Sequence, residues 1–135
     1  MSMATPIEGE KSLLVLDDDA AFRTRLARAL EQRGFEVTSV GSVAEASEIA
    51  AKQPPAYAVL DSRLEDGSGL SVVEALNKSR PDARIVILTG YGAIATAVRK
   101  VIELLQHLPE RGRGLAQAVQ GVLGQLALQA GSHLL

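Results

Sequence analysis

The sequence predicts an α/β fold in which a parallel sheet is covered by helices on both faces. Short apolar runs without alternation recur between residues 11 and 92, and such runs are typical of strands that are buried on both faces. Segments with apolar residues at helical spacing separate these runs, so strands and helices alternate along the chain. Crossovers between parallel strands are right-handed, which limits the arrangements that the chain can adopt.

Composition limits the classes of protein to which the chain belongs. Its 135 residues suffice for one compact domain, and a hydrophobic content of 47% allows a core to form. The net charge of -2 gives no general attraction to nucleic acid or to an anionic membrane, and the lack of cysteine excludes disulfides and thiolate metal sites. No signal peptide or membrane span is evident. We therefore expect a cytoplasmic protein that binds neither nucleic acid nor membranes directly.

The first strand and helix follow a short leader. Residues 1–10 are expected to be a loose leader, and the first strand is predicted at residues 12–16, an apolar run that ends in three aspartates. A helix is predicted over residues 20–33. Asp19 suits its N-cap, its apolar residues recur every four positions, and Gly34 suits the position just after its end.

The next elements repeat this order. Residues 35–40 alternate between apolar and polar, which predicts a second strand. Ser42 and Glu45 have the spacing of a capping box and open a helix that ends near Lys52, before two prolines. A third, fully apolar strand is predicted at residues 56–60.

A loop, a helix and a fourth strand complete the predicted core. The loop at residues 65–69 is rich in glycine, and a helix follows over residues 70–79 until Pro81 breaks the chain. Residues 84–88 form another apolar strand that ends at Thr89.

The tail departs from this alternation. Apolar residues after residue 92 recur at alternating steps of four and three, which is the spacing of a helical packing seam. A glycine-containing turn at residues 109–114 separates two such segments, so we expect a helical hairpin over residues 93–135. The predicted seam consists of Ile94, Val98, Val101, Leu105, Leu108, Leu115, Val119, Val122 and Leu126.

Acidic residues and a threonine follow three of the predicted strands. Ligand sites in open parallel sheets lie beyond the carboxyl ends of the strands, so Asp17, Asp18, Asp61 and Thr89 are expected at one edge. Converging carboxylates repel one another unless a hard cation such as Mg²⁺ binds their oxygens. We expect Asp18 and Asp61 to bind Mg²⁺ directly and Asp17 to bind it through water. Asp61 would then be the nucleophile in phosphoryl transfer, and Thr89 would donate a hydrogen bond to the phosphoryl group.

Several segments resemble known signature sequences. Residues 13–19 (LLVLDDD), 58–64 (AVLDSRL) and 85–90 (IVILTG) are similar to the three signature segments of response-regulator receiver domains. Residues 63–70 and 88–97 resemble more specifically the RegA/PrrA/ActR group, redox-responsive regulators of photosynthesis and of carbon and nitrogen fixation genes. The resemblance covers about residues 11–99.

The resemblance implies a flavodoxin-like (CheY-like) fold over a receiver core at residues 11–92. It also implies phosphoryl transfer from a sensor histidine kinase in the presence of Mg²⁺, with no enzymatic turnover by this chain. The positions that it assigns are the phosphoacceptor Asp61, the acidic pair Asp17 and Asp18, the backbone carbonyl of Arg63 as a metal ligand, and Thr89 with Gly90 at the phosphoryl group.

The sequence departs from the family after Thr89. Receiver domains continue with a fifth strand that carries an aromatic residue and then a Lys followed by Pro, and no such segment is present. The only later lysine, Lys100, falls in the predicted helical segment. We therefore expect an impaired switch. The DNA-binding output helices of the RegA group are also not found in this sequence.

A missing fifth strand predicts an open edge on the fourth strand. Two helical hairpins from two chains could form a four-helix bundle, so we expect a homodimer held by the predicted seam. The alternative is that the hairpin folds back on its own sheet.

Two other functions are compatible with the sequence. The chain could be a non-signalling dimeric interaction module. It could also be a phosphatase of the haloacid-dehalogenase type, because residues 16–19 and 85–89 fit two motifs of that family, with Asp17 as the nucleophile. The later lysine and acidic pair that such enzymes need are lacking.

Overall fold

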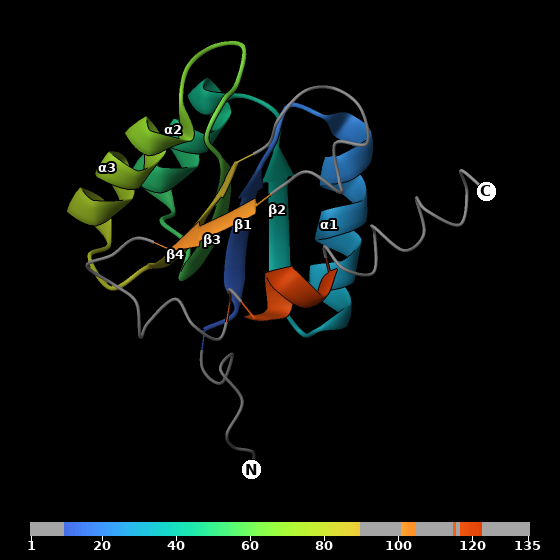
Figure 1. Cartoon of the computed structure of the whole chain (residues 1–135). Helices are drawn as coiled ribbons and strands as arrows, with labels where there is room; N and C mark the ends of the chain where they lie inside the picture. The colour runs from blue at the N-terminus through green and yellow to red at the C-terminus, as the bar shows by residue number, and fades with distance from the viewer. Residues whose placement is uncertain (1–9, 90–100, 105–114, 116, 123–135) are drawn as a thin grey trace.

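The computed structural model describes residues 10–89, 101–104, 115 and 117–122. It contains a five-stranded sheet in the order β2-β1-β3-β4-β5 (Figure 1). The first four strands are parallel, as predicted, and β5 runs antiparallel to β4. The elements are β1 (Ser12–Leu16), α1 (Ala20–Gln32), β2 (Glu36–Val40), α2 (Val43–Lys52), β3 (Tyr57–Asp61), α3 (Gly69–Ser79), β4 (Arg84–Thr89) and β5 (Val101–Leu104).

The helices begin at the predicted capping residues. The Asp19 carboxylate accepts a hydrogen bond from the Phe22 N–H at 3.1 Å, and Gly34 follows α1 with a φ of 102°, a conformation that favours glycine. The Ser42 hydroxyl accepts from the Glu45 N–H at 3.2 Å at the start of α2. The predicted caps are therefore confirmed.

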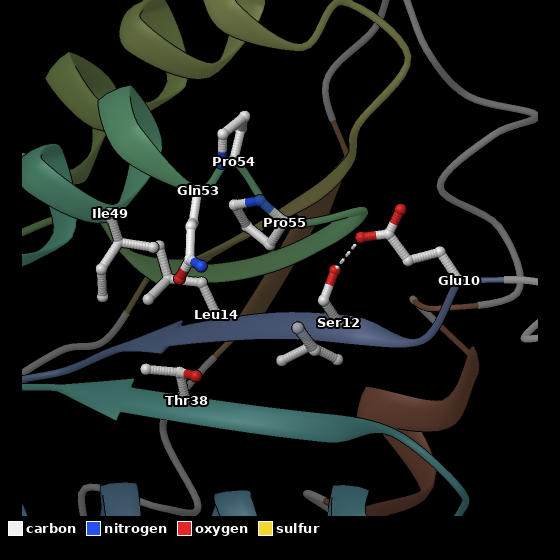
Figure 2. Close-up of a pocket in the computed structure, with 9 residues that line it drawn as sticks. Glu10, Ser12, Leu14, Thr38, Ile49, Gln53, Pro54 and Pro55 are labelled. Atoms are coloured by element: carbon white, nitrogen blue, oxygen red, sulfur yellow. Dashed lines mark hydrogen bonds between the residues drawn. The ribbon is translucent and has the colours of Figure 1, made fainter.

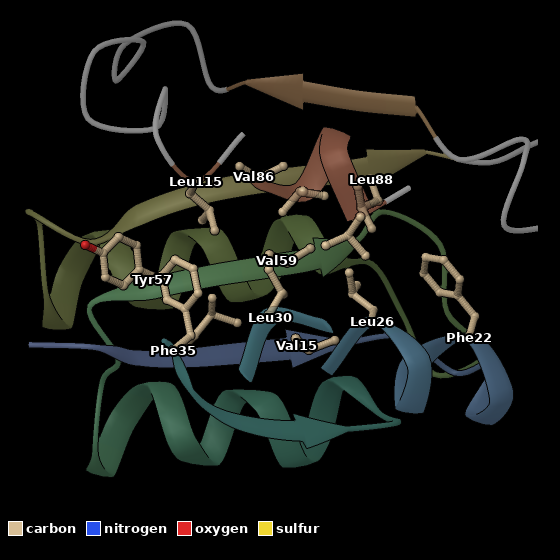
Figure 3. Packing of buried hydrophobic residues seen from close by; sticks show 13 residues of the cluster. Val15, Phe22, Leu26, Leu30, Phe35, Tyr57, Val59, Val86, Leu88 and Leu115 are labelled. Atoms are coloured by element: carbon tan, nitrogen blue, oxygen red, sulfur yellow. The ribbon is translucent and has the colours of Figure 1, made fainter. Parts of the chain in front are cut away.

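Two clusters of buried side chains hold the helices against the sheet. On one face, Phe22, Leu26 and Leu30 of α1 pack against Val15 and Val59 of the central strands (Figure 3). On the other face, α2 and α3 cover the sheet, and their buried residues include Ala46, Ala50, Val72 and Leu76. The predicted α/β architecture with helices on both faces is thus confirmed.

The tail differs from the predicted helical hairpin. Residues 101–104 form a strand, not a helix, and they pair with β4 in the register Val86↔Leu104 to Thr89↔Val101. The predicted open edge of β4 is therefore wrong. An open edge of β4 would present unpaired N–H and C=O groups, and residues 101–104 (VIEL) pair with them. Strand pairing therefore prevails over the helical spacing of this segment. A parallel fifth strand is not found in the described ranges, as predicted.

The second helical segment packs on its own chain. Residues 115 and 117–122 are helical, and Leu115, Val119 and Val122 are buried in the same cluster as α1 (Figure 3). The predicted dimer seam is therefore wrong for these three residues, because they already cover the chain's own sheet. Val101 lies in β5. The other predicted seam residues, Ile94, Val98, Leu105, Leu108 and Leu126, lie outside the described residues, as does most of the leader.

No helix in the part of the chain that the structure describes has both the length and the apolar character needed to cross a membrane.

Candidate functional site

Three carboxylates meet at the carboxyl ends of the parallel strands. Asp17 and Asp18 follow β1, and Asp61 is the last residue of β3. One carboxylate oxygen from each lies within 4.8 Å of those from the other two. Asp17 is fully buried, Asp61 is 5% exposed, and Asp18 is exposed. The predicted convergence of these residues is confirmed.

The backbone of Thr89 lies at the carboxyl end of β4, beside the end of β3 that carries Asp61. β4 ends at Thr89, and the register pairs Asp61 with Leu88, so Thr89 follows the partner of Asp61 by one residue. The Ser62 N–H donates to the Leu88 carbonyl at 2.9 Å, which continues this pairing beyond the strand. The Thr89 side chain and Gly90 lie outside the residues and side chains that the structure describes. Their predicted contact with a phosphoryl group therefore stays a prediction.

The turn after β1 is fixed around Asp17. The Asp17 Oδ1 atom accepts a hydrogen bond from the Asp19 N–H at 2.9 Å. The Arg23 guanidinium, in the first turn of α1, donates to the Asp17 carbonyl at 2.7 Å. Asp19 caps the helix and is not part of the acidic cluster. The three consecutive aspartates therefore have different tasks, as the capping argument predicts for Asp19.

The start of α3 packs directly on the strand that carries Asp61. A Cβ atom added to Gly69 would lie 2.1 Å from the Asp61 carbonyl oxygen, so no side chain fits at this position. The Arg63 N–H donates to Asp61 Oδ1 at 3.3 Å, and the Ser68 hydroxyl donates to the Ser62 carbonyl at 3.1 Å. These contacts fix the backbone that follows Asp61.

The loop between β3 and α3 also contacts α2. The carboxylate of Asp66 accepts hydrogen bonds from the N–H groups of Val43 at 3.0 Å and Ala44 at 3.2 Å. The Val43 hydrogen bond is the main cause that lowers the pKa of Asp66 below its usual range. The resemblance of residues 63–70 to the RegA/PrrA/ActR group includes Asp66 and Gly69, but the contacts of these two residues were not predicted from the sequence. The signals were the match of this segment to the family and the glycines on either side of Ser68.

The donor set fits a hard divalent cation. Mg²⁺ prefers oxygen ligands, and three carboxylates from two strand ends supply them here. Two of these groups are buried, and like charges so close together are unfavourable unless a cation offsets them. Arg63, the predicted source of a carbonyl ligand, lies two residues beyond Asp61 in the loop.

A pocket at the amino-terminal ends of β1 and β3 lacks such a cluster of carboxylates. Ser12 begins β1 and lines this pocket together with Glu10, Pro54 and Pro55 (Figure 2). The Ser12 hydroxyl donates to the Glu10 carboxylate at 2.7 Å, and Glu10 also pairs with Arg80 at 2.7 Å. Glu10, the one acidic residue among those that line the pocket, is thus already bonded to the side chains of Ser12 and Arg80.

Comparisons with known proteins agree with this geometry. The family model described as the response regulator receiver domain matches residues 13–105. The chain is 62% identical over 92 residues to the photosynthetic apparatus regulatory protein RegA of Cereibacter sphaeroides, a match that covers 68% of this chain and 50% of RegA. It is 58% identical over 92 residues to the acid tolerance regulatory protein ActR of Rhizobium meliloti, covering 68% of this chain and 47% of ActR. The chain thus spans about half the length of these curated relatives.

A solved structure gives the same result. A response regulator protein from Burkholderia pseudomallei is similar with a TM-score of 0.60 and 33% identity, covering 93% of this chain and 74% of that chain. That protein was crystallised with a phosphorylated aspartic acid, a calcium ion and citrate. The family match spans more than half of the chain and includes every residue of the acidic cluster. The chain therefore belongs to the response regulator receiver domain family of two-component systems, and its receiver region is similar to the RegA and ActR regulators.

Proposed function

We propose that the chain accepts a phosphoryl group on Asp61 from a sensor histidine kinase and that this reaction requires Mg²⁺. The observation that carries the proposal is the convergence of Asp17, Asp18 and Asp61 within 4.8 Å at one edge of the sheet. The phosphorylated aspartic acid and calcium ion of the Burkholderia pseudomallei relative support the same chemistry.

The residues of the site have separate roles in this reaction. A carboxylate oxygen of Asp61 attacks the phosphorus atom while the bond from phosphorus to the donor nitrogen or oxygen breaks, and the leaving group keeps the electron pair. The product is an acyl phosphate on Asp61. Asp18 and Asp61 would bind Mg²⁺ directly, Asp17 would bind it through water, and the Arg63 carbonyl would add a backbone ligand. When bound, the ion neutralises charge on the transferred phosphoryl oxygens.

We also expect the output of phosphorylation to be impaired. The family pattern of an aromatic residue and then Lys-Pro is missing after Thr89, and the strand that pairs with β4 is antiparallel. Phosphorylation is therefore expected to be slow or to cause only a small conformational response. Leu115, Val119 and Val122 are buried in the core of their own chain, so these three residues are not expected to form a dimer interface.

Labelling with a small phosphoryl donor tests the proposal. The wild-type chain, Asp61→Asn and the control Asp19→Asn are incubated with acetyl phosphate, with and without Mg²⁺. The control removes a neighbouring carboxylate that caps α1 and lies outside the acidic cluster. We expect at most one phosphoryl group per chain, dependent on Mg²⁺, in wild type and in the control. Labelling of Asp61→Asn equal to wild type would contradict the proposal.

The same experiment separates the alternative functions. A phosphatase of the haloacid-dehalogenase type would release phosphate repeatedly and would depend on Asp17 as its nucleophile. Asp17 is fully buried, with one carboxylate oxygen bonded to the Asp19 N–H, which favours a supporting role. A non-signalling interaction module would bind a kinase without becoming labelled.

A further inference from the structure

The loop between β3 and α3 is tied to a helix that is distant in sequence. Residues 62–68 turn back on themselves, and Leu64 and Gly67 exchange backbone hydrogen bonds of 3.0 and 3.3 Å. This exchange places Asp66 at the tip of the turn. The tip lies against α2, because a Cβ atom on Gly67 would be 3.5 Å from the side chain of Val43.

Asp66 adds a second cap to a helix that already has one. The Ser42 hydroxyl accepts a hydrogen bond from the Glu45 N–H. The Asp66 carboxylate accepts hydrogen bonds from the two preceding N–H groups of α2, those of Val43 and Ala44. A carboxylate at this end of a helix is favoured by the helix dipole, and charge-assisted hydrogen bonds are the stronger kind. The partners lie 23 and 22 positions away in sequence, so the contact fixes the loop to α2 and does more than cap a helix.

The other end of the same loop contacts the acidic cluster. The Arg63 N–H donates to Asp61 Oδ1, and Ser68 bonds to the carbonyl of Ser62. Leu64 packs against the buried cluster beneath α2 and α3. The peptide groups around Arg63 are therefore held between the Asp61 side chain on one side and the Asp66 contact on the other.

We propose that Asp66 is a positioning residue for the metal site: its bonds to Val43 and Ala44 hold the peptide groups of Arg63 in place beside Asp61 and so set the affinity for Mg²⁺. The inference rests on the proposed function. Groups that orient the ligands of a metal site change its affinity by roughly 10- to 100-fold when they are removed. Asp66 is exposed, so in a variant without this carboxylate water can replace part of its hydrogen bonding to Val43 and Ala44. We therefore expect its removal to weaken Mg²⁺ binding by about 10-fold, the lower end of this range.

The test compares Asp66→Ala with Ser42→Ala in the full chain. Both variants remove hydrogen bonds at the start of α2, but only Asp66→Ala releases the loop. Isothermal titration with magnesium chloride gives the dissociation constant for Mg²⁺, and thermal unfolding gives the stability of each variant. We expect Asp66→Ala to weaken Mg²⁺ binding about 10-fold and Ser42→Ala to leave it unchanged. Asp66→Asn keeps one acceptor oxygen and should fall between wild type and Asp66→Ala.

The outcomes are distinguishable. Equal Mg²⁺ affinities of Asp66→Ala and wild type would overturn the inference and leave Asp66 as a cap only. A similar loss of affinity in Ser42→Ala would also overturn it, because general weakening of α2 would then be the cause. If Asp66→Ala fails to fold, the affinity of Asp66→Asn decides, and a value equal to wild type would overturn the inference. If wild type itself does not bind Mg²⁺, the proposed function fails first.

Discussion

Gly69 is the position where one added methyl group should disturb both folding and chemistry. The Cβ atom of Gly69→Ala would lie 2.1 Å from the Asp61 carbonyl oxygen. Real Cβ atoms essentially never approach other atoms closer than 3.0 Å, so the gap has to widen by about 0.9 Å. The obstacle is backbone at the end of a buried strand and not the tip of a flexible side chain, so α3 and the strand end must separate.

The cost follows from the packing. Overpacking of a well-filled interior costs roughly 1–3 kcal/mol, and each kcal/mol lowers the melting temperature of a chain of this size by about 4 °C. We therefore expect Gly69→Ala to melt roughly 4–12 °C below wild type. Misplacement of a reacting group by about 1 Å can slow a reaction by about 100-fold, so labelling of Asp61 by acetyl phosphate should slow by up to that factor.

A matched glycine offers the control. The atoms nearest to a Cβ atom on Gly121, in the tail helix, would belong to the Arg33 guanidinium, at 3.1 Å, and that side chain can move. Alanine is favoured over glycine within helices by about 1 kcal/mol, so Gly121→Ala should melt at or above the wild-type temperature. Differential scanning calorimetry measures both variants. A wild-type melting temperature and labelling rate in Gly69→Ala would refute the reasoning about the close contact.

Three further predictions concern the core, a surface ion pair and the charge of the site. Leu115→Ala should lower the free energy of unfolding by about 2–5 kcal/mol in urea titrations, and an unchanged value would mean that the tail does not pack on the sheet. The Arg80 and Ser12 hydrogen bonds lower the pKa of Glu10 from 4.5 to about 2, so the stability from this contact is present above pH 4.5 and is lost as the pH falls towards 2. Unfolding of Glu10→Gln should therefore depend less on pH in that window than unfolding of wild type, and identical pH profiles would contradict this. Asp18→Asn should raise the melting temperature without Mg²⁺, because repulsion in the cluster falls, but should reduce the stabilisation by added Mg²⁺; an Mg²⁺-induced shift as large as that of wild type would argue against a ligand role.

Local patterns were sufficient to predict the receiver core. The apolar run at residues 12–16 and the capping residues Asp19 and Ser42 act over a few positions, so their effects can be inferred without the fold. Ligand sites lie beyond the carboxyl ends of parallel strands, and this rule predicts that Asp17 and Asp61 lie close together. The caps and the acidic cluster both follow from regular helix and sheet geometry, and the structure confirms both.

Contacts over long sequence distances could not be predicted in the same way. The bond from Asp66 to Val43 spans 23 positions and depends on how the loop turns, which the sequence does not encode as a pattern. The tail could not be predicted for a different reason. Residues 101–104 (VIEL) fit helical spacing, yet they also suit a strand. Pairing with the edge of β4 favours the strand, and this pairing is not visible in local spacing. Leu115 satisfied a dimer seam and an internal core equally well by spacing alone.

The most direct measurement is the chemical identification of the labelled residue. Wild type is treated with acetyl phosphate and Mg²⁺, the acyl phosphate is reduced with borohydride, and peptide mass spectrometry locates the modified aspartate. The account predicts modification at Asp61 alone, and only when Mg²⁺ is present during labelling. Modification at Asp17 or Asp18, or equal labelling without Mg²⁺, would contradict it.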